Sequence, residues 1–116
     1  MATTEYNGPD RRRGGPDRRN PDDITRILIV DDHALFRVGI ANILGKEPDL
    51  LVVGEANDSR SAVDRALETS PDIVLMDLSL PAPGGIETTQ RIKRELPSTA
   101  IIVLAVSEDE DALFDA

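Results

Sequence analysis

Two adjacent aspartates, Asp31 and Asp32, directly follow the apolar run ILIV at 27–30, and a third, Asp77, follows the run DIVLM at 72–76. Clustered carboxylates bind hard divalent cations, and an aspartate beside such an ion can attack phosphorus to form an acyl phosphate. A plainer reading makes Asp31 a helix cap and Asp77 a turn residue. Because two apolar runs end in aspartate, and one of the aspartates is doubled, we favour one shared site.

The elements that must position these aspartates begin with four apolar runs of strand length. The runs are rich in Val and Ile and do not alternate with polar residues, so they predict strands buried on both faces of a parallel sheet. They occupy residues 27–30, 50–53, 72–76 and 100–106.

Segments with helical spacing lie between these runs, and the first carries four apolar residues on one face, Phe36, Ile40, Ile43 and Leu44. The second follows the capping candidates Asp58 and Ser59. The third runs from about residue 85 to 96 and ends before Pro97, because a residue that precedes proline avoids the helical region. The alternation predicts an α/β fold, an open parallel sheet with helices on both faces.

In such a sheet, functional groups lie beyond the carboxyl ends of the strands. If the strands at 27–30 and 72–76 are neighbours, the three carboxylates converge, and each pair about 5 Å apart repels by roughly 3 kcal/mol at an effective dielectric constant of about 20. A divalent cation removes this conflict, and oxygen ligands favour Mg²⁺. The chain has one histidine and no cysteine, so no His/Cys cluster favours zinc.

The formal net charge of −9 belongs entirely to the chain beyond residue 23, because residues 1–23 hold five arginines and five acids. An acidic globular part is a poor direct partner for nucleic acid or anionic lipid. Residues 1–23 contain GPDRR twice and predict a disordered, solvated arm, and the alternative is a phosphate-binding arginine arm. We expect residues 24–116 to form one globular domain. Without a membrane-length apolar run or a secretory signal, we expect a cytoplasmic location.

Three stretches, ILIVDDHALFR, IVLMDLSLPAPGG and IIVLAVS, resemble the receiver domain of bacterial response regulators, most closely the NarL/FixJ subfamily. The resemblance covers about residues 25–116. It implies a flavodoxin-like, CheY-like fold with strand order 2-1-3-4-5. It also implies a sensor histidine kinase as partner, a phosphoryl-accepting role for Asp77, and a loop shaped by Pro81 and Gly85. The domain would be a signalling switch that catalyses only its own phosphorylation.

The same resemblance implies a Mg²⁺ site in which Asp32 and Asp77 are ligands, Asp31 holds the ion mainly through water, and the backbone carbonyl of Ser79 completes the set. His33 follows the acidic pair, and we expect an ordinary surface residue in the first helical turn rather than a docking group for the phosphoryl donor.

Two departures from the family pattern concern the switch and the C-terminal part. Ala105 stands where the family has a Thr or Ser that bonds the phosphoryl group, and Ser107 is either its substitute or a helix cap. The family's fifth strand, the lysine that ends it and the last helix are absent from these 116 residues, as is the subfamily's DNA-binding domain. We therefore expect a truncated chain that does not bind nucleic acid by itself. We also expect the strand at 100–106 to have an exposed edge. Dimerisation through that edge or the helical segment at 107–116 is the alternative.

Other functions stay open beside the phosphorelay. The residue at 105 and the missing lysine suggest a receiver-like interaction module that is not phosphorylated. A Mg²⁺-dependent phosphatase usually needs a second acid two residues after its nucleophile, and Ser79 stands there. A nucleotide-binding Rossmann domain is excluded because no G-x-G-x-x-G follows the first run.

Overall fold

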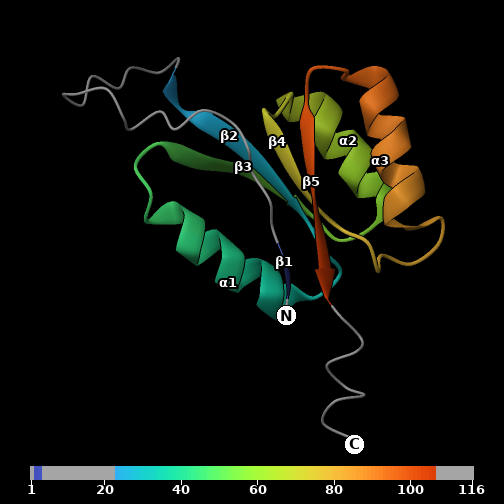
Figure 1. Cartoon of the computed structure of the whole chain (residues 1–116), viewed down its shortest axis with the longest axis horizontal. Helices are drawn as coiled ribbons and strands as arrows, with labels where there is room; N and C mark the ends of the chain where they lie inside the picture. The colour runs from blue at the N-terminus through green and yellow to red at the C-terminus, as the bar shows by residue number, and fades with distance from the viewer. Residues whose placement is uncertain (1, 4–22, 107–116) are drawn as a thin grey trace, which may run out of the picture.

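The computed structural model describes residues 2, 3 and 23–106 of the 116-residue chain (Figure 1). Strands and helices alternate from residue 25 onward, as the sequence predicts. The elements are β1 (Ala2–Thr3), β2 (Thr25–Val30), α1 (Ala34–Gly45), β3 (Leu50–Ala56), α2 (Ser59–Thr69), β4 (Ile73–Asp77), α3 (Gly84–Glu95) and β5 (Ala100–Val106).

One sheet has the strand order β1-β5-β4-β2-β3. β2 pairs in parallel with β3 and with β4, and β4 pairs in parallel with β5. The four parallel strands thus stand in the order second, first, third, fourth along the chain, which confirms the order that the family resemblance implies. β2 and β4 are neighbours, so the two strands that lead into the aspartates end side by side.

Alternate residues of the central strands face two separate apolar layers. Leu28, Val30, Val74 and Met76 pack with residues of α2 and α3. Ile27, Ile29 and Leu75 lie in a second cluster that α1 covers. Because successive strand residues point to opposite faces, α1 must lie on one face and α2 with α3 on the other. Figure 1 shows α2 and α3 together and apart from α1.

Helix ends follow local signals in the sequence. Asp58 caps α2 by accepting a hydrogen bond from the Ser61 backbone N–H, and Ser61 closes a capping box. α3 ends at Glu95, two residues before Pro97. The three helices have 11 or 12 residues, and none in the described part of the chain is long and apolar enough to cross a membrane.

Burial on both faces holds for β2 and β4 but is wrong for β3 and for β5, on which Val103 is 38% exposed. β3 is an edge strand, and Leu51 on it is 50% exposed. Ile43 is also 62% exposed, although the helical spacing placed it on the buried face of α1. A single helix covers this side of the sheet, so only part of the apolar surface of α1 finds a partner.

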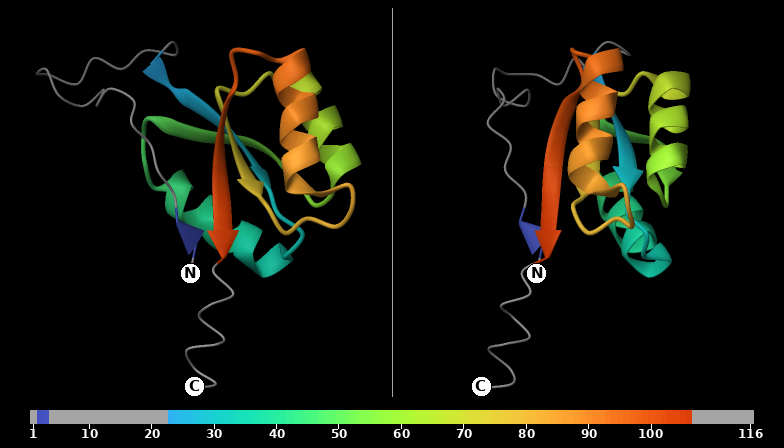
Figure 2. Two further views of the ribbon diagram at one scale, coloured as in Figure 1. Left: turned by 45° about the vertical axis from the view of Figure 1, so that its right-hand side comes forward. Right: turned by 90° about the vertical axis from the view of Figure 1, so that its right-hand side faces the viewer.

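β1 pairs antiparallel with the end of β5, with Ala2 opposite Val106 and Thr3 opposite Ala105 (Figure 2). The prediction that the 100–106 strand has an exposed edge is therefore wrong at the carboxyl end of that strand. The prediction of disorder over residues 1–23 is likewise wrong for Ala2 and Thr3. An open strand edge presents unpaired N–H and C=O groups, which any extended segment within reach can satisfy. Residues 4–22, with the GPDRR repeats, lie outside the described residues.

Candidate functional site

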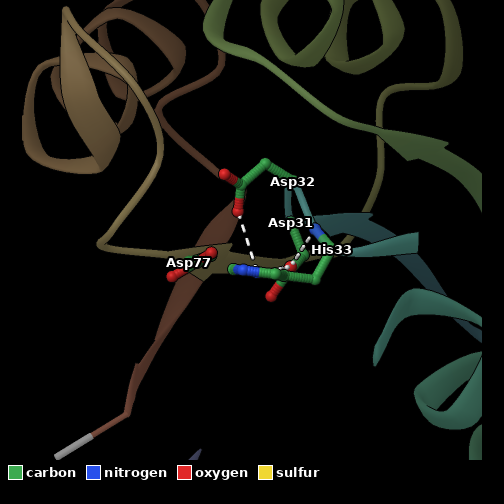
Figure 3. A group of neighbouring side chains, drawn as sticks. All are labelled: Asp31, Asp32, His33 and Asp77. Carbon is green, nitrogen blue, oxygen red and sulfur yellow. Dashed lines mark hydrogen bonds and ion pairs between the residues drawn. The ribbon is translucent and has the colours of Figure 1, made fainter. Parts of the chain in front are cut away.

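The three aspartates meet at the carboxyl end of the sheet. Val30 and Met76 are paired across β2 and β4, which brings the next residue of each strand, Asp31 and Asp77, to the same edge. Ligand atoms of Asp31, Asp32, His33 and Asp77 all lie within 4.8 Å of one another (Figure 3). The predicted convergence is confirmed. Of the plainer reading, the helix cap at Asp31 is wrong, because His33 is the N-cap of α1, whereas Asp77 does accept from the backbone two residues on, as a turn residue does.

Asp31 is buried at 4% exposure, and its side chain faces other acids. Its backbone N–H donates to the Ala56 carbonyl at 3.0 Å, and its Oδ1 accepts from the His33 backbone N–H at 2.7 Å. Burial is the main cause that raises the pKa of Asp31 above the usual 3.8, and the charge of Asp77 adds to it. The bonds from His33 act against this rise. The site therefore holds negative charge at an energetic cost that a cation would relieve.

Asp77 is the last residue of β4 and is 3% exposed. Its Oδ1 accepts two hydrogen bonds from Ser79, from the backbone N–H at 2.9 Å and from the hydroxyl at 2.7 Å. These bonds fix the carboxylate plane beside the loop that follows the strand. The sequence assigns only the Ser79 carbonyl to the site, and the hydroxyl contact is an addition from the structure. The metal-binding role of the carbonyl stays a prediction.

The loop after Asp77 turns tightly before α3. The Pro81 carbonyl accepts from the Gly84 N–H at 2.9 Å. A Cβ on Gly85 would lie 2.5 Å from the Asp77 carbonyl oxygen and 2.8 Å from the Leu78 Cα, so this position has no room for a side chain. Both residues that the sequence assigns to loop shaping thus lie where the chain folds back on Asp77.

Arg37 of α1 ties the acidic loop to the neighbouring strand, a contact that sequence reasoning missed. Its Nη1 donates to the Asp31 carbonyl at 2.6 Å, and its Nε donates to Glu55 Oε1 at 3.2 Å. Arg37 lies six residues after Asp31, in the first turn of the predicted helix. An arginine at that position, shortly after an acidic pair, was the sequence feature that could have indicated this contact. The guanidinium thus contacts the backbone carbonyl of Asp31 rather than its carboxylate.

His33, rather than Asp31, is the N-cap residue of α1, and no side-chain hydrogen bond caps the helix. Its side chain is 70% exposed, which agrees with the predicted surface location. However, its Nδ1 lies 3.0 Å from Asp32 Oδ1 and 3.2 Å from Asp31 Oδ1, so the ring faces the acids. Sequence reasoning missed this contact, although the position of His33 beside the acidic pair pointed to it.

The two switch candidates stay untested. The backbone of Ala105 belongs to β5 and pairs with Thr3, and Ser107 lies outside the described residues. The predicted helical segment at 107–116 lies outside them as well.

Asp31→Asn should stabilise the chain at neutral pH, and this gain should shrink in acid. Because the pKa of Asp31 is raised on folding, the protonated form is favoured in the folded state. The contribution of Asp31 to stability is fully present below pH 3.8 and is lost as the pH rises through the raised pKa. Urea unfolding without divalent ions, from just below pH 3.8 to neutrality, measures the difference between variant and wild type.

Asp58→Asn is the matched control for this pH series. Hydrogen bonds from Ser61 lower the pKa of Asp58, so its contribution is present above 3.8 and is lost as pH falls through the lowered pKa. The two variants should therefore show pH dependences of opposite sign. A gain for Asp31→Asn that does not change with pH would contradict the prediction.

A profile of the response regulator receiver domain matches residues 27–116. The transcriptional regulatory protein LiaR of Bacillus subtilis (strain 168) is 45% identical over 89 residues, which cover 77% of this chain and 42% of LiaR. The chain therefore spans less than half the length of this curated relative.

Solved structures show the same fold. A two-component response regulator of the LuxR family from Aurantimonas sp. SI85-9A1 has a TM-score of 0.69 and 40% identity, over 73% of this chain and 61% of that one. The isolated REC domain of RcsB from Salmonella enterica serovar Typhimurium, determined with the phosphomimetic BeF3−, has a TM-score of 0.68 and 32% identity. That match covers 73% of this chain and 64% of the RcsB domain.

Proposed function

Because the chain belongs to the response regulator receiver domain family, we propose that Asp77 accepts a phosphoryl group from a sensor histidine kinase in a two-component phosphorelay. The observation that carries this proposal is the meeting of three carboxylates within 4.8 Å at the ends of two neighbouring strands. Such a cluster of like charge is unfavourable unless it has a cationic partner. We place the protein in the cytoplasm as part of this proposal.

The donor set fits Mg²⁺. Carboxylate oxygens are the ligands that this ion uses, and one or two of them suffice while water fills the other positions. Asp32 and Asp77 would hold the ion directly, Asp31 would hold it through water, and the Ser79 carbonyl would complete the set. When bound, Mg²⁺ neutralises the oxygens of the phosphoryl group that is transferred.

The residues of the chain position the acceptor for in-line attack. Ser79 holds Asp77 Oδ1 with two hydrogen bonds, so we assign the attack to Oδ2. A P–O bond to Asp77 forms as the P–N bond of the kinase phosphohistidine breaks, and the histidine nitrogen recovers a proton from solvent. The bonds from Arg37 to Asp31 and Glu55 keep the acidic loop in place during the transfer.

Phosphorylation would act as a switch rather than as metabolic turnover. LiaR carries the name of a transcriptional regulatory protein, and this chain spans 42% of its length. We therefore propose that the phosphoryl group controls a DNA-binding output, with homodimerisation as one route. We assign no residue of the described part of the chain to DNA binding. Apart from Ala2 and Thr3, which pair with β5, the division into an arm at 1–23 and a receiver domain at 24–116 remains part of the proposal.

Incubation of the chain with Mg²⁺ and a small acyl phosphate should add one phosphoryl group, measured by intact mass. The adduct should disappear with hydroxylamine, which cleaves acyl phosphates, and should not form when a chelator removes Mg²⁺. Asp64→Asn, which removes an exposed acid of α2 outside the cluster, should be modified like the wild type. A wild-type chain that gains no phosphoryl group and does not bind Mg²⁺ would instead favour the interaction module.

A further inference from the structure

The imidazole of His33 lies within the carboxylate cluster, although its side chain is largely exposed. Its Nδ1 is 3.0 Å from Asp32 Oδ1 and 3.2 Å from Asp31 Oδ1, and Figure 3 shows the ring directed toward the acids. The His33 backbone is held as well, because its N–H donates to Asp31 Oδ1 at 2.7 Å. The main chain and the neighbouring acids thus keep a nitrogen donor at the site.

These separations match those between adjacent ligands of one ion. In an octahedral site with bonds of about 2.1 Å, neighbouring donor atoms lie roughly 3.0 Å apart. Nδ1 and the two carboxylate oxygens already stand near this spacing, and the Asp77 donor lies within 4.8 Å of all of them. One ion can therefore contact the imidazole and the carboxylates of Asp32 and Asp77 with little movement of the chain, while Asp31 lies near enough to hold it through water.

We propose that His33 Nδ1 is a ligand of this metal site, so that the site also takes first-row transition ions such as Zn²⁺, Co²⁺ and Ni²⁺. The inference rests on the proposed function, whose carboxylates supply the other ligands. Imidazole suits these ions, whereas Mg²⁺ prefers oxygen and water. His33 binds in its neutral form, with the hydrogen on Nε2 and the lone pair of Nδ1 directed at the ion. Mg²⁺ leaves the ring unliganded.

NMR of the ring nitrogens gives a direct test, because His33 is the only histidine of the chain. Untagged, ¹⁵N-labelled protein is titrated with Zn²⁺ and separately with Mg²⁺, at one fixed pH at which the free imidazole is neutral. With Zn²⁺, the Nδ1 resonance should move to the position of a metal-bound nitrogen, while Nε2 stays protonated. With Mg²⁺, backbone signals at Asp32 and Asp77 should move and the ring should not bind the ion.

Calorimetry of variants supplies the second readout. His33→Ala should weaken Zn²⁺ and Ni²⁺ binding by about tenfold or more, and should change Mg²⁺ binding much less. Because the His33 side chain is 70% exposed, this substitution leaves the core intact. Asp64→Asn removes an acid outside the cluster and should leave both affinities unchanged.

The outcomes separate this inference from the proposed function. If Zn²⁺ leaves Nδ1 unmoved and His33→Ala binds Zn²⁺ as tightly as wild type, the inference is overturned, while Mg²⁺ binding and acyl-phosphate labelling stand. If neither ion binds the cluster, the metal site of the proposed function fails and the inference fails with it. If Zn²⁺ binds Nδ1 but no acyl phosphate labels the chain, the inference is supported. In that case only the proposal that Asp77 accepts a phosphoryl group is contradicted.

Discussion

The Asp77→Asn variant should gain no phosphoryl group and should unfold at a higher urea concentration than the wild-type chain. The first effect follows because the amide is a far weaker nucleophile than the carboxylate that we propose as acceptor. The second follows because the substitution removes one of three clustered negative charges. Asparagine keeps a carbonyl oxygen that can accept the bonds from the Ser79 N–H and hydroxyl.

The size of the gain in stability follows from the charge separation. Carboxylates about 5 Å apart repel by roughly 3 kcal/mol at an effective dielectric constant of about 20. Asp32 is partly exposed to water, which screens its share of this repulsion. We therefore expect the free energy of unfolding to rise by about 1–2 kcal/mol in the absence of divalent ions. Added Mg²⁺ should narrow the gap, because the ion stabilises the folded wild-type chain.

Intact mass after treatment with an acyl phosphate and urea unfolding with and without Mg²⁺ measure the two effects. Asp64→Asn carries the same charge change outside the cluster and should match the wild type in both. Phosphoryl incorporation in Asp77→Asn equal to wild type would refute the role of Asp77 as acceptor. A loss of stability would show that Asp77 contributes more through its contacts than it costs through its charge.

Gly85→Ala should lower the free energy of unfolding by about 2–3 kcal/mol, a typical cost of an overpacked buried position. The added Cβ would stand 2.5 Å from the Asp77 carbonyl oxygen and 2.8 Å from the Leu78 Cα, both backbone atoms that no side-chain rotation can move. Relief requires α3 to shift away from β4. That shift would also move the loop that carries Ser79, so metal binding at Asp77 should weaken.

Gly39→Ala is the matched control, because nothing lies within 4 Å of a Cβ at that position in α1. There the substitution should raise stability by about 0.5–1 kcal/mol, since alanine favours a helix interior over glycine. Urea unfolding followed by circular dichroism measures both variants. Equal stabilities for Gly85→Ala and wild type would mean that α3 does not press against the end of β4 as closely as the structure shows.

The two predictions test different properties of one site. Asp77→Asn changes charge with little change in shape, and Gly85→Ala changes shape without a change in charge. The carboxylates stay together because the pairing of β2 with β4 brings Asp31 and Asp77 to one edge of the sheet, and Gly85 packs closely against the Asp77 backbone.

The sequence by itself determined the parallel sheet and the three aspartates at its edge. The apolar runs at 27–30 and 72–76 are short, continuous and rich in Val and Ile, and such local composition is typical of buried parallel strands. The motif residues that resemble a receiver domain then supplied the strand order, which the pairing of β2 with β4 confirms. The acidic site followed, because the carboxyl ends of parallel neighbours share one edge.

Only the tertiary structure decided which surfaces find a partner. The exposure of Ile43 and Leu51, the pairing of Ala2–Thr3 with β5, and the direction of the His33 ring all depend on residues that are distant in sequence or on the path of the backbone. Helical or strand periodicity fixes which side of its own element a side chain occupies. It does not specify whether another element, an edge or a carboxylate lies there, because packing between distant segments sets that.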